Sequence, residues 1–190
     1  NVLRNQAAGA QVKISFKTST VIPPQRFAAL DPEVRRLGCM PSLNVYDEKA
    51  DIGVNPETYR RRSCGGHIHM GGSTCLTDMK FRAPAGGGAF KITPYGADLI
   101  KILDFVVGNT CVLIDRDPVA AKRRKVYGRA GEYRLPRHGV EYRTLSNFWM
   151  HNYTLMSFVM GMCRLATSMW YTKASNKLLM EAFDEKKVRK

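Results

Sequence analysis

Acidic residues are scarce in this sequence. It contains 16 Asp and Glu against 30 Lys and Arg, which gives a net charge of +14 at pH 7. A positive excess of this size attracts polyanions such as nucleic acid and nucleotide phosphates, although it says nothing about the fold. With 190 residues, the chain is long enough for one domain with a hydrophobic core, or for two small ones.

Paired cysteines and long apolar runs are also missing. The five cysteines are widely spaced and form no CxxC pair, which favours reduced thiols in a cytoplasmic protein over a secreted disulfide framework. The most apolar stretch, 145–171, is interrupted by His151, Asn152 and Arg164, so it does not predict a membrane span. No GxGxxG motif follows a strand and no GxxxxGK[ST] motif exists, which disfavours a doubly wound nucleotide-binding fold.

Local patterns predict an α+β fold, with a mostly antiparallel sheet and helices packed on one of its faces. Thr93 and Pro94 are typical of a helix start, and Gly108-Asn109 predicts its end. Ser146 is expected to cap a long C-terminal helical region. The remaining expectations are strands at 11–16 and 65–71, a hairpin of 131–135 with 140–145, and a long irregular segment at 23–62.

Two histidines stand two residues apart in the segment GGHIHMG. If the segment is a strand, His67 and His69 project from the same face, and the flanking glycines let a ligand approach closely. Two such imidazoles can bind a divalent metal or contact phosphate, whereas the ordinary alternative is a hydrogen-bonded pair on a solvated strand. A zinc site with Cys64 and Cys75 is disfavoured, because Cys64 would point away from His67.

The expected hairpin carries Glu-Tyr-Arg twice. In extended strands, Glu132 shares a face with Arg134, and Glu141 shares a face with Arg143, while the tyrosines take the other face. Carboxylates suit Mg²⁺ and guanidiniums suit phosphoryl groups or a substrate carboxylate, so the layout favours ATP chemistry. A salt-bridge ladder across the strands is the structural alternative.

Basic residues cluster at 60–62, 122–125 and 186–190. Each cluster is more often a solvated surface than a binding site. The first two flank the expected catalytic strands, where nucleotide phosphates would lie.

Four segments in this order resemble the phage-type COOH–NH2 ligases, which are amidoligases of the glutamine synthetase-like superfamily. They are GGHIHMG, LDFVVGNTCVLIDRD, RRKVYGRAGEYR and GVEYRTLSNFW. The resemblance covers roughly residues 20–155. It implies a single glutamine synthetase-like domain over 1–190 with a basic tail at 184–190. It also implies ATP- and Mg²⁺-dependent joining of a carboxylate to an amine through an acyl phosphate, in the host cytoplasm if the protein is phage-encoded.

The resemblance also assigns residues. By analogy, Arg134, Arg143 and Glu141 are catalytic; His67, His69, Arg123 and Arg124 contact the nucleotide; and Glu132, Glu141 and His67 bind the metal. Family members begin with a strand that carries an acidic motif, and a second strand adds a metal-binding Glu. The chain starts at Asn1 and has neither, so it is expected to be the C-terminal two-thirds of such an enzyme.

The net positive charge is also compatible with a second class of function. The chain could be a non-catalytic basic protein derived from the ligase scaffold, a phage structural or nucleic-acid-binding component. The candidate partners are therefore small-molecule or peptide carboxylates and amines, nucleic acid through the basic clusters, and a neighbouring chain that supplies the missing strands. No membrane partner is expected.

Overall fold

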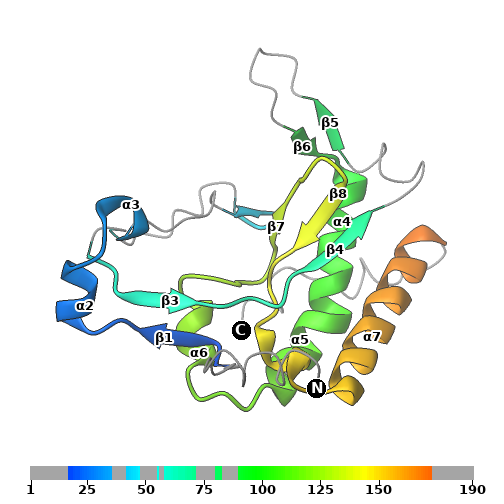
Figure 1. Ribbon diagram of the computed structural model, residues 1–190. Coiled ribbons are helices and arrows are strands. Elements are labelled where there is room, and N and C mark those ends of the chain that lie inside the picture. Colours follow the sequence, from blue (N-terminus) through cyan, green and yellow to red (C-terminus); the bar gives the residue numbers. More distant parts are fainter. Residues whose placement is uncertain are drawn as a thin grey trace.

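A four-stranded antiparallel sheet forms the centre of the protein (Figure 1). The computed structural model describes residues 17–35, 42–47, 55, 58–71, 80–82 and 90–172. The strand order is β2-β7-β8-β4. The bounds are Leu43–Asn44 for β2, Glu132–Arg134 for β7, Gly139–Tyr142 for β8 and Ile68–Gly71 for β4.

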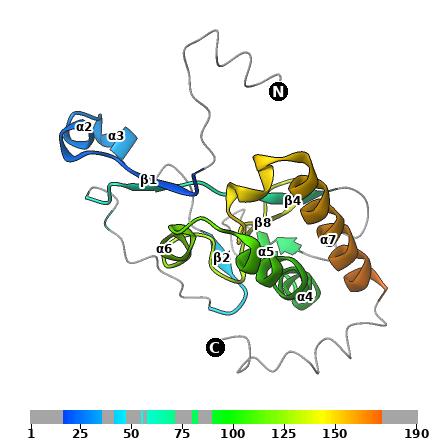
Figure 2. The same ribbon diagram turned by 90° about the horizontal axis from the view of Figure 1, so that it is seen from below.

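Helices cover one face of this sheet. They are α4 (Pro94–Leu103), a π-helical turn η2 (Asp104–Gly108), α5 (Asn109–Ile114) and α7 (Tyr153–Tyr171). Figure 2 shows α4 and α7 side by side beneath the sheet. The core lies between the two layers and draws on both; its fully buried members include Leu103, Val107, Val140, Tyr142 and Val159. The fold is thus a mixed α/β arrangement with antiparallel strands, as expected.

Smaller elements surround the sheet. β1 (Ser19–Val21) pairs with β3 (Arg61–Ser63) in a separate two-stranded ribbon, and β5 (Lys80–Arg82) pairs with β6 (Phe90–Ile92). The short helices are α2 (Pro24–Ala28), α3 (Pro32–Arg35) and α6 (Ala120–Arg124). The segment 23–62, expected to be irregular, therefore contains two helices and parts of two sheets. The strand expected at 11–16 lies outside the described residues.

The start of α4 is confirmed and its expected end is wrong. The Thr93 hydroxyl accepts a hydrogen bond from the Gly96 amide at 3.1 Å, which caps the helix. The chain then stays helical through η2 and α5 up to Ile114. A Cβ on Gly108 would lie 2.7 Å from the Tyr142 hydroxyl, so this glycine permits close packing of the helix against the sheet and does not end the helix.

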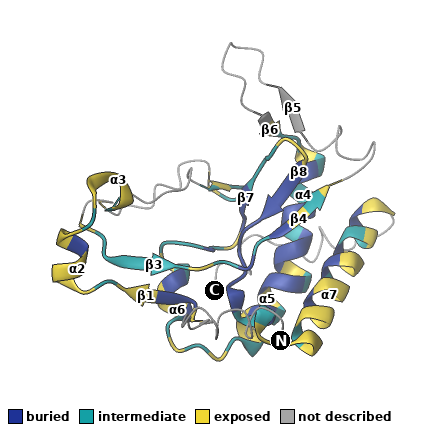
Figure 3. Ribbon diagram, viewed as in Figure 1, coloured by how far each residue is buried: buried dark blue, intermediate teal, exposed yellow. Residues whose placement is uncertain are grey.

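The C-terminal helical region has two parts. Ser146 caps a 3₁₀ helix, η3 (Asn147–His151), and Asn152 caps α7 through the Leu155 amide at 2.9 Å. α7 runs through Gly161 without a break. Figure 3 shows that β8 is buried while the outer side of α7 is exposed. Within the described residues, none of the helices has the length and apolar character needed to cross a bilayer.

Candidate active site

Alternate residues of β8 point to opposite faces of the sheet. Val140 and Tyr142 lie in the core against the helices, and Glu141 therefore points away from it. β7 follows the same rule, because Tyr133 pairs with Tyr142 and Arg134 pairs with Glu141. The predicted hairpin and its division into an aromatic face and an ionic face are confirmed. We call the side of the sheet away from the helices the ionic face.

Four side chains on the ionic face form a closed ring of hydrogen bonds. Arg143 donates to Glu141 Oε1 and, through Nη2, to the Tyr127 hydroxyl at 3.0 Å. The Tyr127 hydroxyl lies 2.7 Å from His67 Nε2, and His67 Nδ1 lies 2.7 Å from Glu141 Oε1. The Arg143 Nε also donates to the Ser42 hydroxyl at 2.9 Å, so the guanidinium is fixed from three sides.

The protons in this ring can be assigned from its chemistry. Burial, followed by the positive charge of Arg143, lowers the pKa of His67 from 6.5 to about 4, and the opposing effect of Glu141 is smaller. The imidazole is therefore neutral at pH 7. Because Glu141 is an acceptor, Nδ1 carries the proton that His67 donates, and Nε2 accepts from Tyr127. The His67–Glu141 contact is thus a hydrogen bond between a neutral ring and a carboxylate.

The ring and its surroundings differ in their exposure to solvent. The Arg143 side chain is 1% exposed and Glu141 is 9% exposed, whereas His67 is 20% exposed and Arg134 is 23% exposed. The Arg134 Nη1 lies 4.0 Å from Glu141 Oε2, whereas the hydrogen bonds of the ring go to Oε1. A ligand that approaches from solvent would therefore meet Arg134 and His67 before Arg143.

Glu132 belongs to a separate buried cluster. Its Oε2 accepts from the Gly128 amide at 2.9 Å, and its Oε1 accepts from Arg129 Nε at 2.8 Å. The Glu132 side chain is 1% exposed. The structure therefore brings His67, Glu141 and Arg143 together. Glu132 lies on the neighbouring strand, where its backbone oxygen accepts from the Arg143 amide at 2.9 Å, but both of its carboxylate oxygens are bonded outside the ring.

Arg123 is buried and faces the backbone. Its guanidinium donates to the carbonyl oxygens of Cys64, Thr144 and Leu145 at 2.7, 3.2 and 2.9 Å. Burial lowers the pKa of Arg123 to about 10, a value at which the group is still charged at pH 7. The side chain joins α6 to the chain before β4 and the chain after β8.

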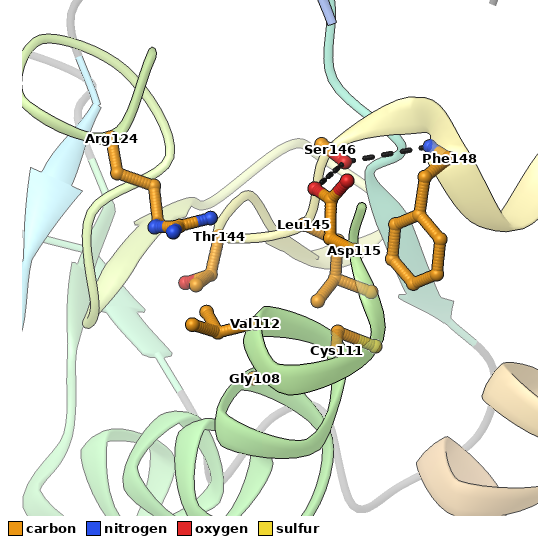
Figure 4. Close-up of a pocket in the computed structure, with 9 residues that line it drawn as sticks. All are labelled: Gly108, Cys111, Val112, Asp115, Arg124, Thr144, Leu145, Ser146 and Phe148. Carbon is orange, nitrogen blue, oxygen red and sulfur yellow. Dashed lines mark hydrogen bonds between the residues drawn. The ribbon is translucent and has the colours of Figure 1, made fainter. Parts of the chain in front are cut away.

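The other two residues expected to contact a nucleotide are not members of the ring. His69 is exposed on β4, where it pairs with Glu141 in the β4–β8 register and contacts His138. His67 precedes the strand, which begins at Ile68, and contacts Glu141 through Nδ1. Arg124 lines a shallow pocket with Asp115, Thr144 and Ser146 (Figure 4). In this pocket, Asp115 accepts from the Ser146 hydroxyl at 2.7 Å.

Asp104 is a buried acid that the sequence did not single out. It lies on the core side of the sheet, accepting from the Gly131 amide at 2.6 Å and from the hydroxyls of Tyr142 and Thr144 at 2.7 and 3.1 Å. Burial raises the pKa of Asp104 from 3.8 to about 6. Tyr142 and Thr144 alternate along the chain with the ring residues Glu141 and Arg143. By bonding to the first two, Asp104 fixes the segment that carries the other two. An acid in the middle of the apolar run 102–107 was the available signal.

Comparison with known proteins identifies the family. The model of the family described as phage phiEco32-like COOH.NH2 ligase, type 2, matches residues 78–188. The chain belongs to this family. Neither a curated protein nor a solved structure matches the chain. The matched region of the ligase sequence includes Glu132, Arg134, Glu141 and Arg143, while His67 lies outside it.

The ionic face of this ligase-family chain has no preformed metal cage. Among the residues that the structure describes, no three His, Cys, Asp or Glu side chains come close enough to hold a metal ion together. Mg²⁺ commonly binds through one or two carboxylates, several waters and substrate phosphates. The Glu141 Oε2, which makes none of the hydrogen bonds of the ring, would be the oxygen available to such an ion.

Proposed function

We propose that this protein is an ATP- and Mg²⁺-dependent carboxylate–amine ligase with a glutamine synthetase-like sheet, and that residues 1–190 form one ligase domain. Membership of the ligase family supports the reaction class. The observation that carries the site assignment is the hydrogen-bonded ring of Glu141, Arg143, Tyr127 and His67 with Arg134 beside it.

The charges on this face favour anionic substrates. Two carboxylates, Glu132 and Glu141, lie among three guanidiniums, those of Arg129, Arg134 and Arg143. Because the positive charges outnumber the negative ones in a partly buried place, a triphosphate or a substrate carboxylate is attracted there. Guanidiniums also bind both groups with paired hydrogen bonds.

Each residue of the site has a proposed task. Arg134, which is both close to Glu141 and open to solvent, would bind the transferred phosphoryl group or the substrate carboxylate. Glu141 would hold Mg²⁺, which neutralises charge on the nucleotide phosphates. Arg143 and neutral His67 would fix the Glu141 carboxylate, so that Oε2 stays directed outward. Positioning of this kind contributes most of the rate in phosphoryl transfer.

The reaction balances in two steps. A carboxylate oxygen of one substrate attacks the γ-phosphorus of ATP, and ADP leaves with the electrons of the broken bond. The amine nitrogen of the second substrate then attacks the acyl carbon, and phosphate leaves with release of the amine proton. The products are an amide, ADP and phosphate, with a small molecule or a peptide supplying the carboxylate and the amine.

The test is ADP release from ATP and Mg²⁺ with a panel of carboxylates and amines. We expect Glu141→Gln to lower turnover about 100-fold or more, the scale seen when a charge-stabilising group is removed from an active site. Glu33→Gln is the matched control, because Glu33 is exposed on α3. Turnover by Glu141→Gln equal to that of the native chain would reject the site.

The net charge of +14 favours one other candidate, a basic nucleic-acid-binding protein. Within the β1–β3 region, however, guanidiniums of the first basic cluster bond to Ile22 O, Ser19 Oγ and Arg35 O. If nucleic-acid binding is the function, affinity for duplex DNA should fall steeply as salt is raised, because phosphate contacts release counterions. Binding that is absent or insensitive to salt would dismiss this candidate.

A further inference from the structure

Two exposed histidines meet at the edge of the four-stranded sheet. His69 lies on β4, and His138 lies in the turn that leads into β8. His69 Nδ1 and His138 Nε2 are 3.1 Å apart, and the ring centroids are 5.3 Å apart. Neither side chain belongs to the ring around Glu141.

Glycines bring the two histidines together. Gly71 pairs with Gly139 in the β4–β8 register, next to the pair of Met70 and Val140. A Cβ on Gly139 would lie 1.9 Å from Met70 O, and a Cβ on Gly71 would lie 3.0 Å from His138 O. Larger residues would push the turn away from β4, so the close approach of the imidazoles is built into the backbone.

We propose that His69 and His138 form a two-imidazole site for a divalent transition metal ion such as Ni²⁺, Zn²⁺ or Cu²⁺. Two nitrogens that bind one such ion at about 2.0–2.1 Å, with an angle of about 90–110° between them, are separated by about 2.9–3.4 Å. The observed separation of 3.1 Å falls within this interval. Each ring can therefore turn one lone pair toward the same ion with little movement of either strand.

The imidazole nitrogens of His69 and His138 also determine which metal ions the site prefers. Imidazole suits Ni²⁺, Cu²⁺ and Zn²⁺, whereas Mg²⁺ prefers carboxylate oxygen and water. No cluster of three or more ligand side chains occurs in the described part of the chain, so water would complete the coordination. His69 pairs with Glu141 in the β4–β8 register, so the imidazole pair lies beside the proposed Mg²⁺ ligand and differs from it in the ion that it prefers. The proposal does not depend on the ligase proposal.

The chain offers a complete set of controls, because it has only four histidines. The experiment titrates tag-free, chelator-treated protein with Ni²⁺ by calorimetry in a Cys64→Ser background, since Cys64 is an exposed thiol. The variants are His69→Gln and His138→Gln. The controls are His151→Gln, which removes an exposed histidine of η3, and His67→Gln, which removes the histidine of the ring.

We expect one equivalent of Ni²⁺ to bind and each of the two variants to weaken binding at least about tenfold, the scale of losing an interaction in a metal site. The two controls should bind as the parent does, and a 100-fold excess of Mg²⁺ should not compete. Thermal melts without metal show whether each variant is folded, and Ni²⁺ should raise the melting temperature of the parent but not that of the variants. Absence of Ni²⁺ binding by the parent, or equal binding by all variants, would overturn the proposal.

Discussion

The buried acids on the two faces of the central sheet have different charge environments. On the core side, Asp104 accepts hydrogen bonds from an amide and from hydroxyls, but burial outweighs them and raises its pKa to about 6. On the ionic face, Glu141 contacts Arg143 and lies near Arg134. The segment of β8 thus contacts a structural acid through Tyr142 on one side and carries a charge-compensated acid, Glu141, on the other. The cations mark the side on which an anionic reaction can be supported.

Arg123 shows that a guanidinium beside the ionic face can be purely structural. We expect Arg123→Met to lower the free energy of unfolding by about 3 kcal/mol or more, because three buried carbonyl oxygens lose a charged donor. Lys122→Met is the control, since Lys122 is exposed on the same helix, and it should change stability by less than about 0.5 kcal/mol. Urea unfolding measures both. If the two variants were equally stable, the role of Arg123 would be refuted.

Asp104 and His67, on opposite faces of the sheet, should have opposite effects on how stability changes with pH between pH 4 and 6.5. Asp104 has a raised pKa, so the native state binds more protons than the unfolded state, and its contribution falls as pH rises from 3.8 to about 6. His67 has a lowered pKa, so its contribution falls as pH drops from 6.5 to about 4. Each effect is on the order of 3 kcal/mol before any offset.

Single variants separate these two effects. Relative to the native chain, the stability of Asp104→Asn should rise with pH across this window, and that of His67→Gln should decline. Urea unfolding at several pH values gives the differences. Parallel pH profiles for the two variants would show that the contrast between the faces does not exist.

Tyr142 and Glu141 are neighbours on β8 that face opposite ways. We expect Tyr142→Phe to cost about 2 kcal/mol, because the Asp104 carboxylate loses a buried hydroxyl donor, while turnover stays within about threefold of the native value. Tyr153→Phe is a suitable control, because Tyr153 is 83% exposed. Thermal melts and ADP release measure the two effects. A collapse of turnover in folded Tyr142→Phe would mean that the core side takes part in catalysis.

The sequence predicted the sheet face of each side chain in the hairpin, because side chains alternate between the two faces along a strand. Glu141, Arg143, Tyr133 and Tyr142 were assigned to the correct faces because a hairpin of period two fixes them. Contacts between distant segments could not be predicted. His67 contacts Glu141 from the segment before β4, which begins only at Ile68. The Glu132 carboxylate accepts from the Gly128 amide and from Arg129. The burial of Asp104 depends on hydroxyls that a strand far along the chain supplies.

Two arginines on the ionic face provide the most direct test of the account. The Arg134 side chain is 23% exposed and lies near Glu141, and the Arg129 side chain is 27% exposed and lies against Glu132. The measurement is kcat/KM for the carboxylate substrate in Arg134→Gln and Arg129→Gln. The account predicts a loss of about 100-fold in Arg134→Gln and a change within about threefold in Arg129→Gln. The reverse order, or equal losses, would contradict the placement of the reaction at Glu141.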